Sequence, residues 1–235
     1  MRESSAYGGG RTAVVAGATG LVGRELVRQL LEENAYSKVI ALVRRTTGME
    51  HPHLEERLTD FDRLEAAAGD FAGADLFCAL GTTIKKAGSQ ELFRKVDFDY
   101  PLRLAELGKQ EGIRSYSLVS AMGANARSSI FYNRVKGEAE ERIAALGLRA
   151  VFLFRPSLLL GERDEFRRAE RFASAVAKPL SWIFAGPLRK YKPVEGAAVA
   201  AAMIASALPG NAGVHILESD EIARVARLYN ARHSR

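Results

Sequence analysis

The chain has 235 residues, 47% of them hydrophobic, and a formal net charge of +6. This length can form one large core, and the apolar runs are too short and interrupted for stable membrane insertion. The basic residues are interleaved with 28 acidic ones, which favours a solvated surface over a nucleic-acid-binding one. The single cysteine, Cys78, excludes an intrachain disulfide and is typical of the cytoplasm. The four histidines lack metal-ligand spacing, so no metal site is predicted.

Residues 1–10 are polar and rich in glycine, without the apolar segment of a signal peptide. We expect a flexible N-terminal tail followed by a single domain over residues 11–235. The sequence does not indicate an oligomeric state.

The stretch T-A-V-V-A-G-A-T-G-L-V-G at residues 12–23 runs a short apolar strand into three glycines spaced three apart. The first glycine allows the chain to reverse, the second lets the backbone approach a pyrophosphate, and the third lets the following helix pack closely. An amphipathic helix follows, with its N-terminus directed at the phosphates. An ordinary tight turn is the alternative, but the context favours a dinucleotide site. The candidate contacts are Gly17, Thr19, Gly20, Leu21, Val22 and Gly23.

The next strand, at residues 38–43, ends in Arg44 and Arg45. An NAD-binding chain normally has a carboxylate near this point for the ribose 2′-hydroxyl, whereas here none occurs before Glu50. Two guanidinium groups could bind a 2′-phosphate through forked, charge-assisted hydrogen bonds. Alternatively, the two arginines are simply solvent-exposed residues at the end of the strand. The pattern therefore favours NADP(H) over NAD(H).

Apolar strands alternate with helical segments along the rest of the chain, which predicts an α/β fold with a doubly wound, mostly parallel sheet. Pro101 falls within a helical stretch at residues 89–110, so we expect a kink or two helices there. Ligands bind beyond the carboxyl ends of such strands. The further strands are predicted at residues 56–59, 74–80, 115–120, 150–154 and 214–217.

Two strand ends carry candidate site residues. The strand at 74–80 leads into Leu80, Gly81 and Thr82, where the glycine would let the backbone run beneath a cofactor. The strand at 115–120 ends at Ser120, and a helical segment further on contains Tyr132 and Lys136. Because these two are four residues apart, they share one helix face.

This trio is suited to carbonyl reduction or its reverse. The Lys136 ammonium and an oxidised nicotinamide would both stabilise a Tyr132 phenolate, which would act as general acid or base. Ser120 would hydrogen-bond the substrate oxygen.

The sequence resembles the short-chain dehydrogenase/reductase superfamily in its extended or atypical branch. More narrowly, the segments at 78–83, 96–100, 132–138 and 154–156 resemble the Tat-interactive-protein type of oxidoreductase and its bacterial relatives. The resemblance covers about residues 12–208. It implies an NADP(H)-binding Rossmann fold with a catalytic Ser120, Tyr132 and Lys136. It also implies further cofactor contacts, namely Asp60 and Phe61 near the adenine and Arg155, Pro156 and Ser157 near the nicotinamide.

One residue departs from the superfamily pattern. Many members have an asparagine in a proton relay on the helix before the fifth strand, and the nearest candidate here is Asp97. An ionised aspartate accepts hydrogen bonds but cannot donate them. The branch also includes NADPH-binding regulators, so a non-catalytic NADPH sensor acting through protein partners is the alternative function.

Residues 157–195 are predicted to form a small substrate lobe for a small-molecule substrate. Within it, residues 172–192 could be a lid, a helix packed on the sheet or a shallow membrane contact.

Overall fold

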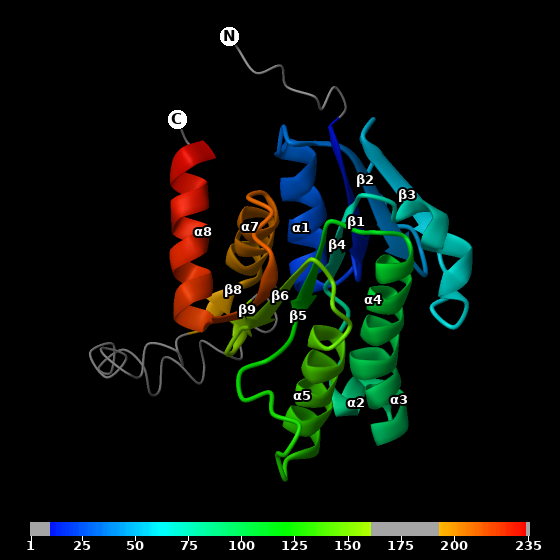
Figure 1. Cartoon of the computed structure of the whole chain (residues 1–235), viewed down its shortest axis with the longest axis vertical. Coiled ribbons are helices and arrows are strands. Elements are labelled where there is room, and N and C mark those ends of the chain that lie inside the picture. The colour runs from blue at the N-terminus through cyan, green and yellow to red at the C-terminus, as the bar shows by residue number, and fades with distance from the viewer. Residues whose placement is uncertain (1–9, 161–192, 234–235) are drawn as a thin grey trace.

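The computed structural model describes residues 10–160 and 193–233. Within them, seven parallel strands form one sheet in the order β3-β2-β1-β4-β5-β6-β9 (Figure 1). This confirms the predicted α/β fold, and the strand order is that of a classic dinucleotide-binding sheet. The strands are β1 (Arg11–Ala16), β2 (Tyr36–Val43), β3 (Leu54–Leu58), β4 (Asp75–Cys78), β5 (Ser115–Val119), β6 (Ala150–Arg155) and β9 (Gly213–Glu218).

The central strands form because their side chains are buried on both sides. Every residue of β4 and β5 is buried, which is the pattern expected for parallel strands covered by helices on both faces. The first strand pairs with β2 on one side and β4 on the other, so the chain reverses its direction of winding at β1. This reversal creates a crevice at the carboxyl ends of β1 and β4.

Helices cover both faces of the sheet (Figure 1). One face carries α1 (Leu21–Glu32), α7 (Gly196–Ala207) and α8 (Ser219–His233). The other carries the 3₁₀ helix η1 (Leu64–Asp70), α4 (Tyr100–Gln110) and α5 (Phe131–Ala144).

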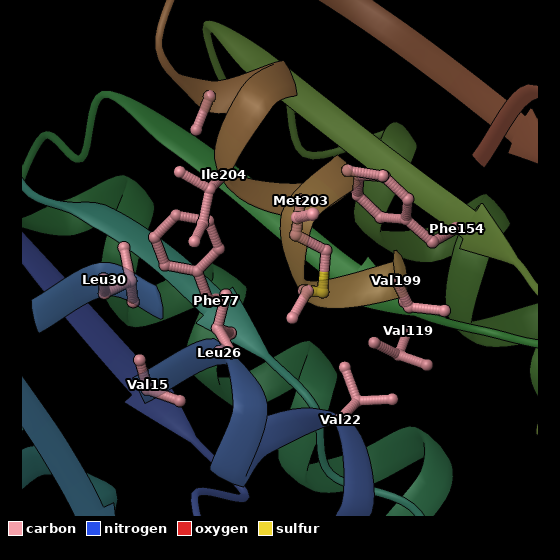
Figure 2. Packing of buried hydrophobic residues seen from close by; sticks show 14 of the residues in the cluster. Val15, Val22, Leu26, Leu30, Phe77, Val119, Phe154, Val199, Met203 and Ile204 are labelled. Atoms are coloured by element: carbon pink, nitrogen blue, oxygen red, sulfur yellow. The ribbon is translucent and has the colours of Figure 1, made fainter. Parts of the chain in front are cut away.

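Core packing on the first face holds α1 in position against the sheet. Figure 2 shows Leu26 and Leu30 of α1 packed with Phe77 of β4 and with Met203 and Ile204 of α7. All five side chains are fully buried. Burial of this apolar stripe anchors α1 against the sheet, and its N-terminus thereby stays at the carboxyl ends of the strands.

Helical backbone runs through the segment around Pro101 without a break. After the short α2 (Ile84–Ala87), it comprises α3 (Gln90–Arg94), the π-helical η2 (Lys95–Asp99) and α4. Proline lacks an N–H donor and its ring clashes with the carbonyl four residues earlier, so the wider π turn directly before Pro101 relieves this conflict. The helix thus accommodates Pro101 through one wider turn.

A small second sheet pairs β7 (Leu159–Leu160) with β8 (Val194–Glu195) in parallel, and the sequence did not predict it. The predicted N-terminal tail and substrate lobe lie largely outside the described residues, as do all of residues 172–192. Within the described ranges, no helix is long and apolar enough to span a bilayer.

Candidate functional site

The turn between β1 and α1 is built from closely packed backbone. Gly17 has a φ of +89°, and a Cβ there would lie 2.5 Å from the Ala79 carbonyl oxygen. A Cβ on Gly23 would lie 2.1 Å from the Gly17 oxygen. At Gly20, in contrast, the nearest atom to a Cβ would be 3.3 Å away. Packing therefore requires Gly17 and Gly23, whereas the bare backbone at Gly20 is suited to close approach by a ligand.

The N-terminus of α1 has no side chain that competes with an anion. Gly20 is its N-cap and supplies no capping oxygen, and the first turn contains no acidic residue. The free N–H groups and the positive end of the helix dipole therefore favour a bound phosphate.

A cavity of about 520 Å³ opens at this turn. Eight residues that the sequence predicted as cofactor contacts come together around it, from four different segments of the chain. They are Gly17, Thr19, Gly20, Arg44, Phe61, Leu80, Gly81 and Thr82. A cavity of this size is within the usual range for a cofactor site.

The sequence missed the wall of the cavity formed by α2 to α4. Its lining residues lie on helices and not at strand ends, where the sequence signal was sought. The Asp62 carboxylate holds this wall in place, because it accepts a hydrogen bond from the Tyr100 hydroxyl at 3.0 Å and pairs with Lys95 at 2.7 Å. The lining residues missed on this wall are Lys86, Ala87, Leu92, Lys95, Val96 and Tyr100, and one further lining residue, Ala79, directly follows β4.

The two predicted arginines have different positions. Both are exposed, but only Arg44 lines the cavity. The chain beyond Arg45 is fixed by Glu56 of β3, whose carboxylate accepts hydrogen bonds from the Thr46 hydroxyl at 2.5 Å and the Thr47 N–H at 3.0 Å. The Glu56 carboxylate is therefore bound by the loop that follows Arg45.

Asp60 and Phe61 also differ. The Phe61 side chain is buried, lines the cavity and lies 5.6 Å from the Tyr100 ring. Asp60 is exposed, does not line the cavity, and accepts a hydrogen bond from the Asp62 N–H at 3.0 Å. Phe61 is thus placed to contact a flat ring, and Asp60 shapes the turn that follows.

Ser120 directly follows β5 and is 5% exposed. Its N–H donates to the Phe154 carbonyl at 2.7 Å, but its hydroxyl has no hydrogen-bond partner among the described residues. A buried hydroxyl without a partner is costly, so it marks a position where a ligand oxygen would be stabilised.

Tyr132 lies one helical turn before Lys136 on α5, as the spacing predicted. Its ring packs against Phe93 of α3, with the centroids 5.3 Å apart. Among the described residues, no hydrogen bond joins the Tyr132 hydroxyl to Ser120. Packing therefore holds the Tyr132 ring in place, while its hydroxyl is not hydrogen-bonded to Ser120 in the described part of the chain.

Lys136 is almost completely buried and is paired with an acid. Its Nζ lies 2.8 Å from Oδ1 of Asp97 and 3.4 Å from the Val119 carbonyl oxygen. Burial acts to lower the pKa of Lys136, but the negative charge of Asp97, with smaller contributions from Tyr132 and Cys78, raises it above the usual value. Lys136 is therefore held in its charged form.

Gly81 connects this pair to the cavity. A Cβ on Gly81 would lie 3.6 Å from Oδ1 of Asp97 and 4.0 Å from Nζ of Lys136. Because Gly81 also lines the cavity, the ammonium lies directly behind the cavity wall. The cofactor cavity and the predicted catalytic lysine are thus neighbours.

The three predicted contacts at the end of β6 and directly after it have structural partners and do not line the cavity. Arg155 makes charge-assisted hydrogen bonds to Glu140 at 2.5 and 3.1 Å and one to Glu218 at 3.4 Å. These raise the pKa of Arg155, with Glu140 making the largest contribution. The Pro156 carbonyl accepts from the Met122 N–H at 2.9 Å, and the Ser157 N–H donates to the Ser219 hydroxyl at 2.7 Å. These contacts tie β6 to α5, β9 and α8.

The other predicted contacts in the turn have side chains directed elsewhere. Val22 is buried in the core that Figure 2 shows, and a Cβ on Gly196 would lie 2.9 Å from the Leu21 side chain. Neither side chain lines the cavity, so only the backbone of these two residues could contact a phosphate. In the part of the chain that the structure describes, no cluster of three potential metal ligands occurs.

Comparison with known families gives an independent result. The model of a family described as NAD(P)H-binding matches residues 17–177. This range begins at the first glycine of the turn and includes every residue named above from Gly17 to Ser157.

Two curated relatives are similar over most of their length. Protein HTATIP2 of Rattus norvegicus is 37% identical over 178 residues, which are 73% of this chain and 73% of the relative. The mitochondrial protein FMP52 of Eremothecium gossypii is 33% identical over 223 residues, or 93% and 98% of the two chains. These relatives support the resemblance to the Tat-interactive-protein type. They come from a rat and a fungus, so the bacterial part of that resemblance stays a prediction.

Solved structures share the fold at low identity. MoeE5 in complex with UDP-glucose and NAD has a TM-score of 0.65 at 17% identity, covering 92% of this chain and 81% of that one. A short chain dehydrogenase family protein from Francisella tularensis has a TM-score of 0.64 at 13% identity, covering 92% and 100%. At these identities the comparison shows a common Rossmann-like architecture.

Proposed function

This chain belongs to the NAD(P)H-binding protein family, and from that premise we propose that it is an NADP(H)-dependent oxidoreductase of the short-chain dehydrogenase/reductase type. Its substrate would be a small carbonyl compound or alcohol, and its location the cytoplasm. One observation carries the proposal. The cavity at the glycine turn adjoins the buried Lys136 ammonium through Gly81, so the phosphate-binding turn and one of the proposed reactive groups are neighbours across the cavity wall.

The residues present are suited to the cofactor. The bare backbone at Gly20 and the open N-terminus of α1 would hold the pyrophosphate, and Phe61 would contact the adenine. Arg44 would pair with a 2′-phosphate. When bound, the reduced nicotinamide would donate a hydride to the substrate carbon, and the oxidised nicotinamide would accept one from it in the reverse reaction.

The remaining chemistry is assigned to three side chains. Tyr132 would give a proton to the carbonyl oxygen during reduction and take it back during oxidation. The unpartnered Ser120 hydroxyl would donate a hydrogen bond to the same oxygen. Lys136 would hold the nicotinamide ribose and stabilise negative charge on Tyr132.

The cofactor preference can be tested by calorimetry with NADPH and NADH. A charge-assisted hydrogen bond contributes about 1.5–3 kcal/mol, so NADPH should bind at least about tenfold more tightly than NADH. Arg44→Ala should remove most of this difference, while the matched Arg45→Ala, outside the cavity lining, should retain it. Equal wild-type affinities for the two dinucleotides would contradict the assignment.

A second function is favoured by one observation, the absence of a hydrogen bond between Ser120 and Tyr132 among the described residues. A protein that binds NADPH as a sensor and acts through protein partners needs no such contact. Incubation with NADPH and a panel of aldehydes, ketones and quinones separates the two functions. Sustained oxidation of NADPH would identify an enzyme, and binding without oxidation would favour the sensor.

A further inference from the structure

Asp97 is a buried acid on the π-helical turn η2. It is 1% exposed, and both of its oxygens face groups of other segments. Oδ2 accepts a hydrogen bond from the Thr82 N–H at 2.9 Å, and Oδ1 lies 2.8 Å from Nζ of Lys136. Single π turns inside helices are rare and occur frequently at functional sites. Here the π turn directs a carboxylate to the carboxyl ends of β4 and β5.

The Asp97–Lys136 pair joins four segments at one point. Thr82 follows β4, Val119 ends β5, Lys136 belongs to α5 and Asp97 to η2. The Lys136 ammonium has three N–H donors, and the chain offers it two acceptors, the Asp97 carboxylate and the Val119 carbonyl. One donor is left for a group on the cavity side, where Gly81 separates the ammonium from the cavity.

A relay role does not explain this geometry. Relay by a side chain requires a group that both donates and accepts, whereas an ionised aspartate beside an ammonium only accepts. Burial without a counter-charge would make a charged Lys136 unfavourable, because an isolated buried ion has lost its hydration. The contact with Asp97 compensates for the lost hydration, and each of the two buried charges stabilises the other.

We propose that Asp97 is a positioning residue that fixes the Lys136 ammonium, in its charged form, at the carboxyl ends of β4 and β5 so that its remaining N–H donor meets the cofactor ribose. This inference rests on the proposed cofactor function. Asp97 acts through Lys136 and has no contact of its own with the substrate.

The conservative variant Asp97→Asn removes the charge and keeps the shape, and its side-chain oxygen can still accept from the Thr82 N–H. The matched control is Asp99→Asn, an exposed acid on the same π turn. The first readout is the titration of the Lys136 side chain, followed by NMR with isotope-labelled lysine and assigned with Lys136→Met. Besides Asp97, the titratable groups that act on this ammonium are Tyr132 and Cys78.

The expected result is a lower pKa of Lys136 in Asp97→Asn and an unchanged one in Asp99→Asn, because burial in Asp97→Asn then acts without the opposing charge. The second readout is NADPH affinity by calorimetry. Asp97→Asn should weaken it about tenfold, as expected for loss of one well-placed hydrogen bond. In the background of Lys136→Met, the same substitution should change NADPH affinity less than about twofold, because Asp97 then has no ammonium to position.

The outcomes separate this inference from the function on which it rests. Wild-type protein that fails to bind NADPH would refute both. Wild-type binding with an unchanged affinity in Asp97→Asn, or an equal loss in the two lysine backgrounds, would refute only the positioning role. If Asp97→Asn does not fold, the double variant Asp97→Asn with Lys136→Met should recover the fold, since replacing both partners removes the uncompensated charge. A double variant that is equally unfolded would overturn the inference.

Discussion

Replacing two of the turn glycines by alanine, one at a time, should have different effects. One replacement should lower the stability of the fold, and the other should weaken NADPH binding. In Gly23→Ala the new Cβ would lie 2.1 Å from the Gly17 oxygen, 2.7 Å from its carbonyl carbon and 3.0 Å from the Ala18 Cα. All three are backbone atoms, so no side chain can move aside. Overpacking of this kind costs about 1–3 kcal/mol or more, and the better helix propensity of alanine offsets only about 1 kcal/mol of it. Because all three contacts are with backbone, we take the upper figure of about 3 kcal/mol and subtract about 1 kcal/mol, which gives an expected net loss of roughly 2 kcal/mol in the free energy of unfolding.

Gly20→Ala should behave in the opposite way. Its Cβ would meet only the Gly17 oxygen at 3.3 Å, and the backbone φ of −79° suits any residue. Unfolding in urea should therefore show a change below about 1 kcal/mol, while calorimetry should show NADPH binding weakened at least about tenfold, because a methyl group occupies the approach to the phosphates. If Gly20→Ala bound NADPH as the wild type does, or if Gly23→Ala were as stable as the wild type, our reading of the turn would be refuted.

Two further predictions concern reactive side chains. Tyr132→Phe should leave NADPH affinity within about twofold and lower turnover of a confirmed carbonyl substrate about 10²–10⁴-fold in steady-state assays, whereas full activity would show that the phenol transfers no proton. Burial raises the pKa of the Cys78 thiol, so its thiolate should form only above the usual pH range. Titration with a disulfide reagent between pH 7 and 9 should therefore find Cys78 unreactive in the native protein and fully reactive in urea.

The sequence predicted the sheet because parallel strands leave a strong local pattern. Six of the seven principal strands are largely apolar runs, whereas β3 has three charged residues out of five, and the structure has all seven. The two-residue pair β7 and β8 was missed because it is too short to have a hydrophobic period and joins segments distant in the chain.

The cavity lining was predictable where its residues follow strand ends. The glycine turn and the chain around Gly81 follow strands directly, and both line the cavity. Arg155 is the last residue of a strand, but Glu140 and Glu218 bind it, and these partners come from separate elements that no spacing rule connects. The Asp97–Lys136 contact is of the same kind. Sequence showed both residues, and only the packing of η2 against α5 shows that they form a pair.

This pair changes the electrostatic argument for catalysis. From sequence alone, Lys136 is a lone positive charge that attracts the negative charge developing on Tyr132. In the structure, a carboxylate lies 2.8 Å from that ammonium, and both groups are almost completely buried. Seen from Tyr132, the two opposite charges cancel in part, so the attraction is weaker than a lone ammonium would exert. In the proposed mechanism, the main contribution of Lys136 would therefore be the fixed direction of its remaining hydrogen bond, and this direction would depend on Asp97.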